Sequence, residues 1–251
     1  NKAIHLAMKH QSVEIVKQLL DVGVPVDQKN AQGWTALHMA CAAGSLRGME
    51  LLLKRGADYN LQDKGGHTPL IICCANDFSD MTNKLLNQKN ISLTPTNFSR
   101  QQNCLHFASL RGNTSICQKI LQLCVAQEPE ESTKNGKEEE QEEAMTILET
   151  VIQQRTVQGW TPFHSSILGG EPPLLELYLS PPFRKFININ ETKNDGESPL
   201  HIAVKILGKE MERMVEGGGD LKKRGESLVK RREVFVRLLE MEGLKIDERF
   251  L

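Results

Sequence analysis

Cysteine and histidine are the residue types in this chain that carry the most chemistry. The 251 residues include six cysteines and seven histidines, enough for a thiol nucleophile or a zinc site. A zinc site needs paired ligands at short spacing, such as Cys-x-x-Cys. No such pair occurs among Cys41, Cys73, Cys74, Cys104, Cys117 and Cys124. We therefore expect small, buried, reduced cysteines in an intracellular protein, and no metal site.

Glycine motifs give no sign of catalysis or of a nucleotide site either. The sequence lacks a P-loop, a dinucleotide-binding glycine motif and a G-x-S-x-G motif. The glycine run at 217–219 has no flanking strand and helix of the kind that a phosphate cradle needs. We expect no catalytic residue and no cofactor.

Five of the histidines belong to one repeated pattern of four residues. Its copies are Lys2–His5, Thr35–His38, Thr68–Ile71, Asn103–His106, Thr161–His164 and Ser198–His201. The first three copies lie 33 residues apart, and the later spacings need insertions. A fixed period of this length is the signature of a repeat architecture, in which each unit stacks on its neighbours.

Each copy has the same surroundings. Polar turn residues and a glycine such as Gly33 or Gly66 precede the motif, and a short apolar helix follows it. A second helix carries a pair of leucines, as in Leu52-Leu53, and a glycine such as Gly56 is placed to end it. Lys89 stands at that position in the third unit, and Gln101 replaces the turn glycine of the fourth.

These features closely resemble the ankyrin repeat, whose pattern is D-x-x-G-x-T-P-L-H-x-A, two helices and then G-A-D-x-N. The resemblance implies an all-α solenoid of stacked helix-turn-helix units with β-hairpin-like turns, forming one domain over 1–251. We place units 1 to 6 at 1–29, 30–62, 63–94, 95–124, 155–190 and 191–247. In this family the motif Thr caps the first helix, and the motif His packs inside and bonds to the backbone of neighbouring turns. We also expect Cys41 and Cys74 to stack at equivalent core positions.

Two insertions interrupt the units. The segment 125–154 begins with a Glu-rich run, which predicts a solvated loop. Its second half has Ile147, Leu148, Val151 and Ile152 at helical spacing, so we expect a helix within 138–153. The segment 208–231 holds basic runs and glycines, and we expect a flexible loop between helices at 199–207 and 233–241. A contact for a basic partner remains the alternative for the first insertion, and a localisation or phosphate-binding role for the second.

Composition narrows the class of partner. The formal net charge is −1, whereas a nucleic-acid-binding domain needs a basic footprint. No apolar run reaches the roughly 20 residues of a membrane span. We therefore expect another protein as the partner, with no nucleic acid and no membrane insertion. We also expect a monomer in the cytoplasm, with the nucleus as the alternative location.

The family usually binds partners on a concave surface made of hairpin tips and first helices. Both tryptophans occupy the position before the motif Thr, where an exposed Trp would suit an interface. The alternative is that they shield the stack. The candidate partner-binding residues are Gln32, Trp34, Lys64, His67, Asn76, Arg111, Gln158, Trp160 and Glu197.

The leading hypothesis is therefore a non-catalytic interaction module, a scaffold or adaptor. The first unit begins without a preceding hairpin, so we expect a fragment of a longer protein. This observation favours a second hypothesis, a regulatory segment of a larger enzyme or channel.

Overall fold

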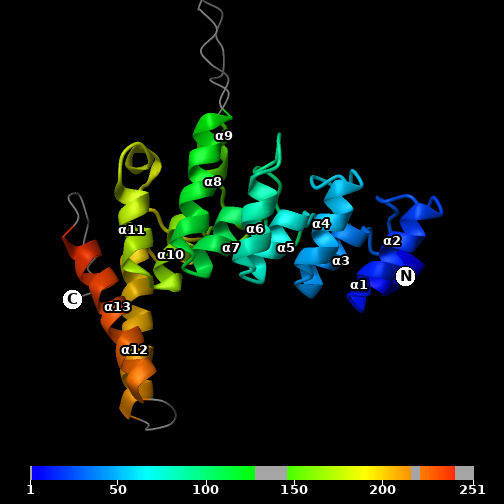
Figure 1. Cartoon of the computed structure of the whole chain (residues 1–251). Coiled ribbons are helices and arrows are strands. Elements are labelled where there is room, and N and C mark those ends of the chain that lie inside the picture. Colours follow the sequence, from blue (N-terminus) through cyan, green and yellow to red (C-terminus); the bar gives the residue numbers. More distant parts are fainter. Residues whose placement is uncertain (1, 128–145, 216–220, 241–251) are drawn as a thin grey trace, which may run out of the picture.

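The molecule is a row of helix pairs in which each pair stacks on the next (Figure 1). The computed structural model describes residues 2–127, 146–215 and 221–240. The first helices of the six pairs are α1 (Ala3–Lys9), α3 (Ala36–Ala43), α5 (Pro69–Ala75), α7 (Cys104–Leu110), α10 (Pro162–Gly169) and α12 (Pro199–Val215). Their partners are α2 (Val13–Asp21), α4 (Leu46–Lys54), α6 (Ser79–Leu86), α8 (Thr114–Ala126), α11 (Pro172–Leu179) and α13 (Leu221–Leu239).

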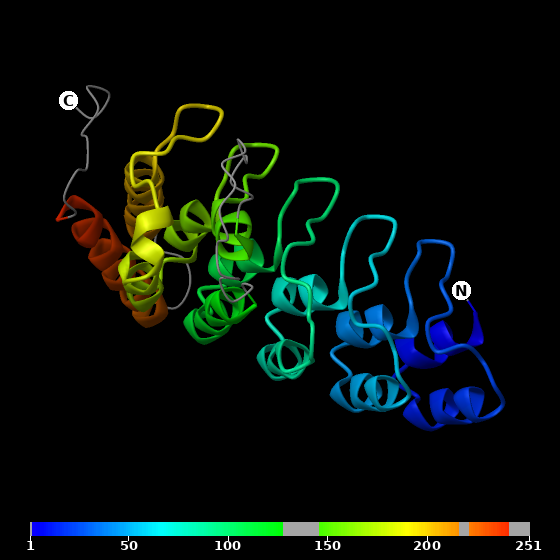
Figure 2. The same cartoon turned by 90° about the horizontal axis from the view of Figure 1, so that it is seen from above.

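Two further elements lie between these pairs, and the connecting loops share one side of the row. The additional elements are α9 (Ile147–Gln153) and the 3₁₀-helix η1 (Phe183–Phe186). Figure 2 shows the long loops projecting together, with the second helices on the opposite side. No strand occurs in the described ranges, so the expected all-α solenoid is confirmed. Within the same ranges no helix is long and apolar enough to cross a membrane.

The motif histidine and the residue three positions before it cap the first helices together. In α3, Thr35 Oγ1 accepts from the His38 backbone N–H, and His38 Nδ1 accepts from the Thr35 N–H at 3.2 Å. Units 4, 5 and 6 repeat this arrangement with Asn103, Thr161 and Ser198. The pair satisfies two backbone donors at a helix start that would otherwise lack partners. The predicted Thr cap is confirmed, and Asn serves equally in unit 4.

The Nε2 atom of four motif histidines forms a hydrogen bond to the loop of the following unit. Nε2 lies 2.8–3.1 Å from a carbonyl oxygen of the following loop, in the pairs His5–Trp34, His38–His67, His106–Trp160 and His164–Glu191. Where Nδ1 accepts from a backbone N–H, the proton must sit on Nε2, which donates to the carbonyl. Burial lowers the pKa of His106 and of His164 to about 4, so both rings are neutral at pH 7. The expected structural role of the motif histidines is confirmed for His5, His38, His106 and His164.

All six cysteines are buried and free, as expected. Cys41 interacts with Cys73 of the next unit, and Cys74 interacts with Cys104 of the unit after that. Cys41 and Cys74 are both buried in the first helices of their units, at equivalent core positions as expected. Burial raises the pKa of Cys104 and of Cys117 to about 12, which keeps these thiols protonated and poorly nucleophilic.

The expected loop over 208–231 is wrong. α12 continues to Val215 and α13 already begins at Leu221, so most of the segment is helical. Lys, Arg and Glu favour helices nearly as well as Leu does, and a basic run on a helix needs only a solvated face. The inner side of the pair is anchored by Val234 and Leu238, which are buried. Met241, the expected end of the second helix, lies outside the described residues.

Contacts with unit 5 also hold α13 in place. Lys230 Nζ lies 2.7 Å from Glu171, and Arg237 lies 2.8 Å from Glu176. Arg231 donates from Nη1 to the Leu168 carbonyl at 3.1 Å, where it satisfies an acceptor near the end of α10. Lys230, Arg231 and Arg237 thus have local partners, which the sequence pattern did not reveal.

The insertion after unit 4 contributes a helix to the stack. α9 buries Leu148, Val151 and Ile152, and the Val151 carbonyl accepts from Asn103 Nδ2 at 2.8 Å. The expected helix is thus confirmed for 147–153. The acidic run and the rest of that expected helix, over 128–145, lie outside the described residues.

Among the described residues, left-handed backbone without glycine occurs at Gln11, Asp77, Asn90 and Gln101. Gln101 has φ 57°, where the other loops have glycines such as Gly33 at φ 81°. In unit 3, Lys89 stands where the other units have the glycine that ends the second helix. The left-handed residue there is the next one, Asn90, with φ 60°. Asn tolerates this region better than most residues, while Gln pays a steric cost.

Replacing Gln101 with Gly should raise the free energy of unfolding by about 1 kcal/mol, because glycine adopts φ 57° without strain. Urea unfolding followed by circular dichroism measures the change. Ser99→Gly is the matched control in the same loop, since Ser99 is not left-handed and its replacement only adds chain entropy. The interpretation fails if Gln101→Gly stabilises the protein no more than Ser99→Gly does.

Candidate functional site: the groove around Trp160

The loop tips form a ridge that is held together by backbone hydrogen bonds. The tip of each loop donates to the loop before it, at 2.8–3.1 Å. The bonds run from Lys64 to Gln32, from Phe98 to Gly65, from Val157 to Arg100 and from Asn194 to Gln158. Because each tip is pinned to its neighbour, the side chains on the ridge have defined spacings.

Short polar side chains shape the individual tips. Asn30 Oδ1 accepts from the backbone N–H groups of Gln32 and Trp34, each at 2.9 Å. In unit 5, Thr156 Oγ1 accepts from the Trp160 N–H at 3.0 Å. Such bonds close the turn locally. They set the direction in which each tryptophan leaves the ridge.

Two cavities on the groove side of the ridge share one wall. The first, about 350 Å³, lies between units 4 and 5 and is lined by Trp160, Leu110, Leu168, Val157 and Arg100 among others. The second, about 380 Å³, lies between units 5 and 6 and is again lined by Trp160 and Leu168. Trp160 therefore stands between two hollows that open from one groove.

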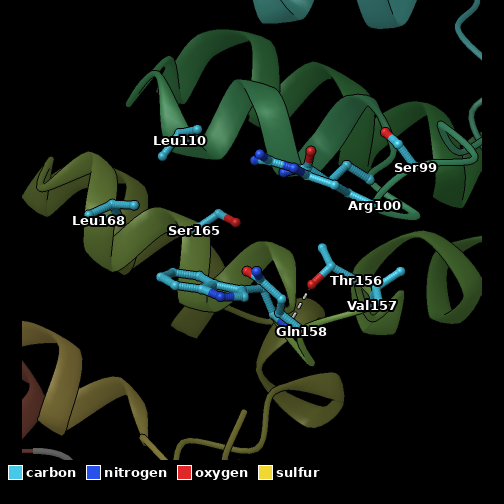
Figure 3. A pocket seen from close by; sticks show the side chains of 10 residues that line it. Ser99, Arg100, Leu110, Thr156, Val157, Gln158, Ser165 and Leu168 are labelled. Carbon is cyan, nitrogen blue, oxygen red and sulfur yellow. Dashed lines mark hydrogen bonds between the residues drawn. The ribbon is translucent and has the colours of Figure 1, made fainter. Parts of the chain in front are cut away.

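The first cavity has a mixed lining, in which Leu110, Leu168, Val157 and Trp160 are the apolar side chains and Arg100 is the charged one among the described residues. Leu110, Leu168 and Val157 are each more than a third exposed, at 37, 37 and 57 %. Figure 3 shows Arg100 on one side of the cavity, opposite Gln158 and Ser165. Exposed apolar side chains around a concave pocket favour binding of an apolar group.

The second cavity has charged walls. Lys193 is 7 % exposed, and its Nζ lies 4.6 Å from the centroid of the Trp160 ring. The same Nζ lies 2.9 Å from Asp195 and 2.7 Å from Glu197. The bond to Lys193, together with Lys205, lowers the pKa of Glu197. The Lys193 ammonium group, with its two carboxylate partners, thus packs against one side of the Trp160 ring.

The structure brings three of the nine candidate residues together and leaves the others apart. Gln158 and Trp160 line the first cavity, and Trp160 and Glu197 line the second. Gln32 and Lys64 are exposed on the ridge, and Trp34 is half-buried in unit 2. None of these three lines either cavity.

The remaining three candidates are engaged in local bonds. His67 Nδ1 lies 3.2 Å from Asp63. Asn76 Nδ2 donates to the Ile72 carbonyl at 2.9 Å, and the Arg111 guanidinium donates to the Ala75 carbonyl. These side chains stabilise the ends of first helices and a loop. A partner that binds them would have to compete with these bonds.

Sequence reasoning missed several groove residues that share one register. Leu110, Leu168 and Lys205 each lie four positions after the motif histidine of their unit. They follow the same helical turn, and each of them lines a cavity. This position could have been chosen from the repeat alone. Arg100 and Lys209 had no such signal, because their directions depend on the neighbouring units.

The chain is similar in sequence to several known proteins. A family model described as ankyrin repeats (3 copies) matches residues 1–63. The B-cell lymphoma 3 protein homolog of Mus musculus is 38 % identical over 119 residues, which are 44 % of this chain and 25 % of that protein. Tyrosine-protein kinase HTK16 of Hydra vulgaris is 30 % identical over 121 residues, which are 47 % of this chain and 16 % of the kinase.

A solved structure shares the fold over almost the whole length. An ankyrin repeat domain from Acinetobacter baumannii AYE gives a TM-score of 0.60 at 20 % identity, covering 94 % of this chain and 95 % of that one. The two sequence relatives are much longer, and the chain spans a quarter of the mouse protein's length and less of the kinase's.

Proposed function

Because this chain is an ankyrin-repeat protein, we propose that it is a non-catalytic module that binds a partner protein in the groove around Trp160. Ankyrin repeats generally mediate protein–protein interaction, and function on such a scaffold belongs to its surface. The observation that carries the proposal is the pair of cavities, about 350 and 380 Å³, that share the Trp160 wall. A large, half-buried aromatic ring between two pockets suits an interface anchor.

The chemistry of the buried groups supports binding over catalysis. The motif imidazoles are neutral and fully used by backbone bonds in units 2, 4 and 5. Burial raises the pKa of the thiols at Cys104 and Cys117, so they do not serve as nucleophiles at neutral pH. Within the described part of the chain, no cluster of His, Cys, Asp and Glu is arranged to hold a metal.

In this proposal the partner is anchored at Gln158, Trp160 and Glu197. A longer partner would continue along the ridge, where it would meet Lys64 and Gln32 and then Trp34. The hydrogen-bonded tips keep this ridge rigid, which lowers the entropy cost of binding. His67, Asn76 and Arg111 would add contacts only for a partner that reaches unit 3 or the ends of the first helices.

Replacing Trp160 with Ala should weaken partner binding at least tenfold, because it removes the wall that both cavities share. Proteins captured by the wild-type chain are identified, produced separately and titrated by calorimetry. Trp34→Ala is the matched control: it makes the same change at the same repeat position, outside both cavities. Circular dichroism confirms that both variants fold.

Equal loss for the two tryptophan variants would place the anchor on the whole ridge instead of the groove. Unchanged affinity in both would overturn the proposal, since the partner would then bind the second helices or an insertion.

One relative favours a second candidate function, a regulatory ankyrin segment of a larger enzyme. The matched part of the Hydra vulgaris tyrosine-protein kinase covers 16 % of that protein. Determining the full transcript from which this sequence derives tests the idea. A catalytic domain in the same reading frame would support it, and a reading frame of repeats alone would exclude it.

We place the protein in the cytoplasm or the nucleus. Six buried cysteines without a disulfide suit a reducing compartment. Imaging of a fluorescent fusion in host cells tests this assignment, and accumulation in the secretory pathway would contradict it.

A further inference from the structure

Positively charged side chains outnumber negatively charged ones in the groove around Trp160. The two cavities have five cationic side chains and three acidic ones, whereas the whole chain has a net charge of −1. The cationic side chains are Arg100, Lys193, Lys205, Lys209 and Arg231, and the acidic ones are Asp195, Glu197 and Glu210. The groove is therefore more positive than the protein that carries it.

Each acidic group of the groove already has a cation beside it. Asp195 and Glu197 both contact Lys193, and Glu197 also lies 2.7 Å from Lys205. Glu210 lies 3.6 Å from Arg231. A cationic partner would find these carboxylates occupied, and it would have to displace a lysine or an arginine to reach them.

Two cations at opposite ends of the groove have no such partner. Arg100 lines the first cavity and Lys209 the second, and neither makes an ion pair with another described residue. Arg100 is exposed at the loop tip, and Figure 3 shows its side chain lying along the edge of the cavity. Within the described ranges, neither side chain would have to leave an ion-pair partner in order to bind an incoming anion.

We propose, building on the function proposed above, that the groove binds an acidic peptide segment of the partner protein. A large apolar side chain of that segment enters the cavity between units 4 and 5, against Leu110, Leu168 and Trp160. Acidic side chains on either side of it pair with Arg100 and Lys209. The apolar anchor supplies most of the affinity, and the charges orient the segment and speed its association.

The lining favours a peptide over a nucleic acid. Proteins that bind single-stranded nucleic acid without sequence preference stack successive bases on several aromatic rings. Trp160 is the one aromatic residue in the lining of these two cavities. Lys193, which covers its ring, is neutralised by two carboxylates. One ring between two apolar or mixed hollows fits a single anchoring side chain better than a series of bases.

The test uses the full chain and three labelled 12-residue peptides. The first consists of Glu and Ser around a central Phe-Leu pair, the second replaces every Glu by Lys, and the third replaces Phe-Leu by Ala-Ala. Fluorescence anisotropy gives the dissociation constants in 50 and 300 mM NaCl. We expect measurable binding of the first peptide alone, weakened several-fold at the higher salt concentration because the ion pairs are exposed.

Charge reversal on the protein locates the binding. Arg100→Glu with Lys209→Glu should weaken the acidic peptide at least tenfold. Lys17→Glu is the matched control, since it makes the same kind of change at an exposed position on α2, remote from both cavities. We expect it to alter the dissociation constant less than twofold. Circular dichroism shows that all variants fold.

Three results would overturn the inference: equal binding of acidic and basic peptides, an acidic peptide indifferent to Arg100 and Lys209, or no binding of any peptide at 1 mM. Tighter binding of a labelled 12-nucleotide single strand would assign the groove to nucleic acid instead. A partner that depends on Trp160 but binds through a segment without acidic residues would refute the charge assignment alone. The proposed function would then stand.

Discussion

Lowering the pH from 7 to 4 should remove several kcal/mol from the free energy of unfolding. Burial lowers the pKa of His106 and His164 to about 4 in the folded protein, against an ordinary value of 6.5. Between these values the unfolded chain binds protons that the folded chain does not. Stability is therefore fully present above pH 6.5 and falls as the pH drops towards 4. Each ring contributes on the order of 3 kcal/mol.

The physical cause is the bond between units. In His164 Nδ1 accepts a backbone hydrogen bond while Nε2 donates to the next loop. In His106 Nε2 lies 3.1 Å from the Trp160 carbonyl oxygen, and Nδ1 lies close to both the Asn103 N–H and the Asn103 side-chain oxygen. A protonated ring can no longer accept at Nδ1, and its charge would be buried between two helix pairs. Burial lowers the pKa of His38 in the same direction. Carboxylates such as Glu197, whose pKa is lowered from 4.5, add to the loss only near the lower end of this range.

Urea unfolding at a series of pH values between 7.5 and 4 gives the profile. His106→Gln combined with His164→Gln should flatten it, since Gln keeps a donor but does not titrate. His10→Gln is the matched control, because it makes the same substitution at an exposed histidine that lies outside the repeated motif. A wild-type profile that is level between pH 6.5 and 4.5 would show that the buried rings are not held neutral.

Replacing Gly169 with Ala should lower the free energy of unfolding by about 2–3 kcal/mol. Gly169 ends α10, where an added Cβ would lie 2.4 Å from the Ser109 carbonyl oxygen and 3.2 Å from the Gly112 nitrogen. Both atoms are backbone, so only a separation of units 4 and 5 relieves the clash. Overpacking of this kind costs about 1–3 kcal/mol, and a backbone contact lies at the upper end.

Gly208→Ala is a control with the opposite expected sign. Gly208 lies inside α12, and a Cβ there would meet nothing within 4 Å. Alanine should therefore stabilise this helix by about 1 kcal/mol through its higher helix propensity. Thermal unfolding of the two variants beside the wild type provides the comparison. If both substitutions stabilise the protein, units 4 and 5 are not packed through Gly169.

The Gly169 variant also bears on binding. The first cavity lies between units 4 and 5, and Leu168 in its wall precedes Gly169. Separating these units would move Leu110 away from Leu168. Weakened partner binding in this variant, without any change to the cavity side chains, would therefore show that the groove depends on the stacking of these two units.

The sequence alone was sufficient for the features that every unit repeats. The motif His38 and its cap Thr35 could be assigned their roles because the cap forms within four consecutive residues. The burial of the cysteines followed for the same reason, since their place in the repeat decides which side faces the core. Local bonds and a strict period can be read without a three-dimensional structure.

The tertiary structure decided what depends on neighbouring units. It made helices of most of 208–231, because α13 finds partners for Lys230 and Arg237 on unit 5. It also separated two tryptophans that hold the same place in the repeat: Trp160 lines both cavities, and Trp34 lines neither. The position of a residue in the repeat indicates whether its side chain can face the groove. Whether a hollow forms beside them depends on the side chains that the adjacent units place there, as Arg100 and Leu168 do at Trp160.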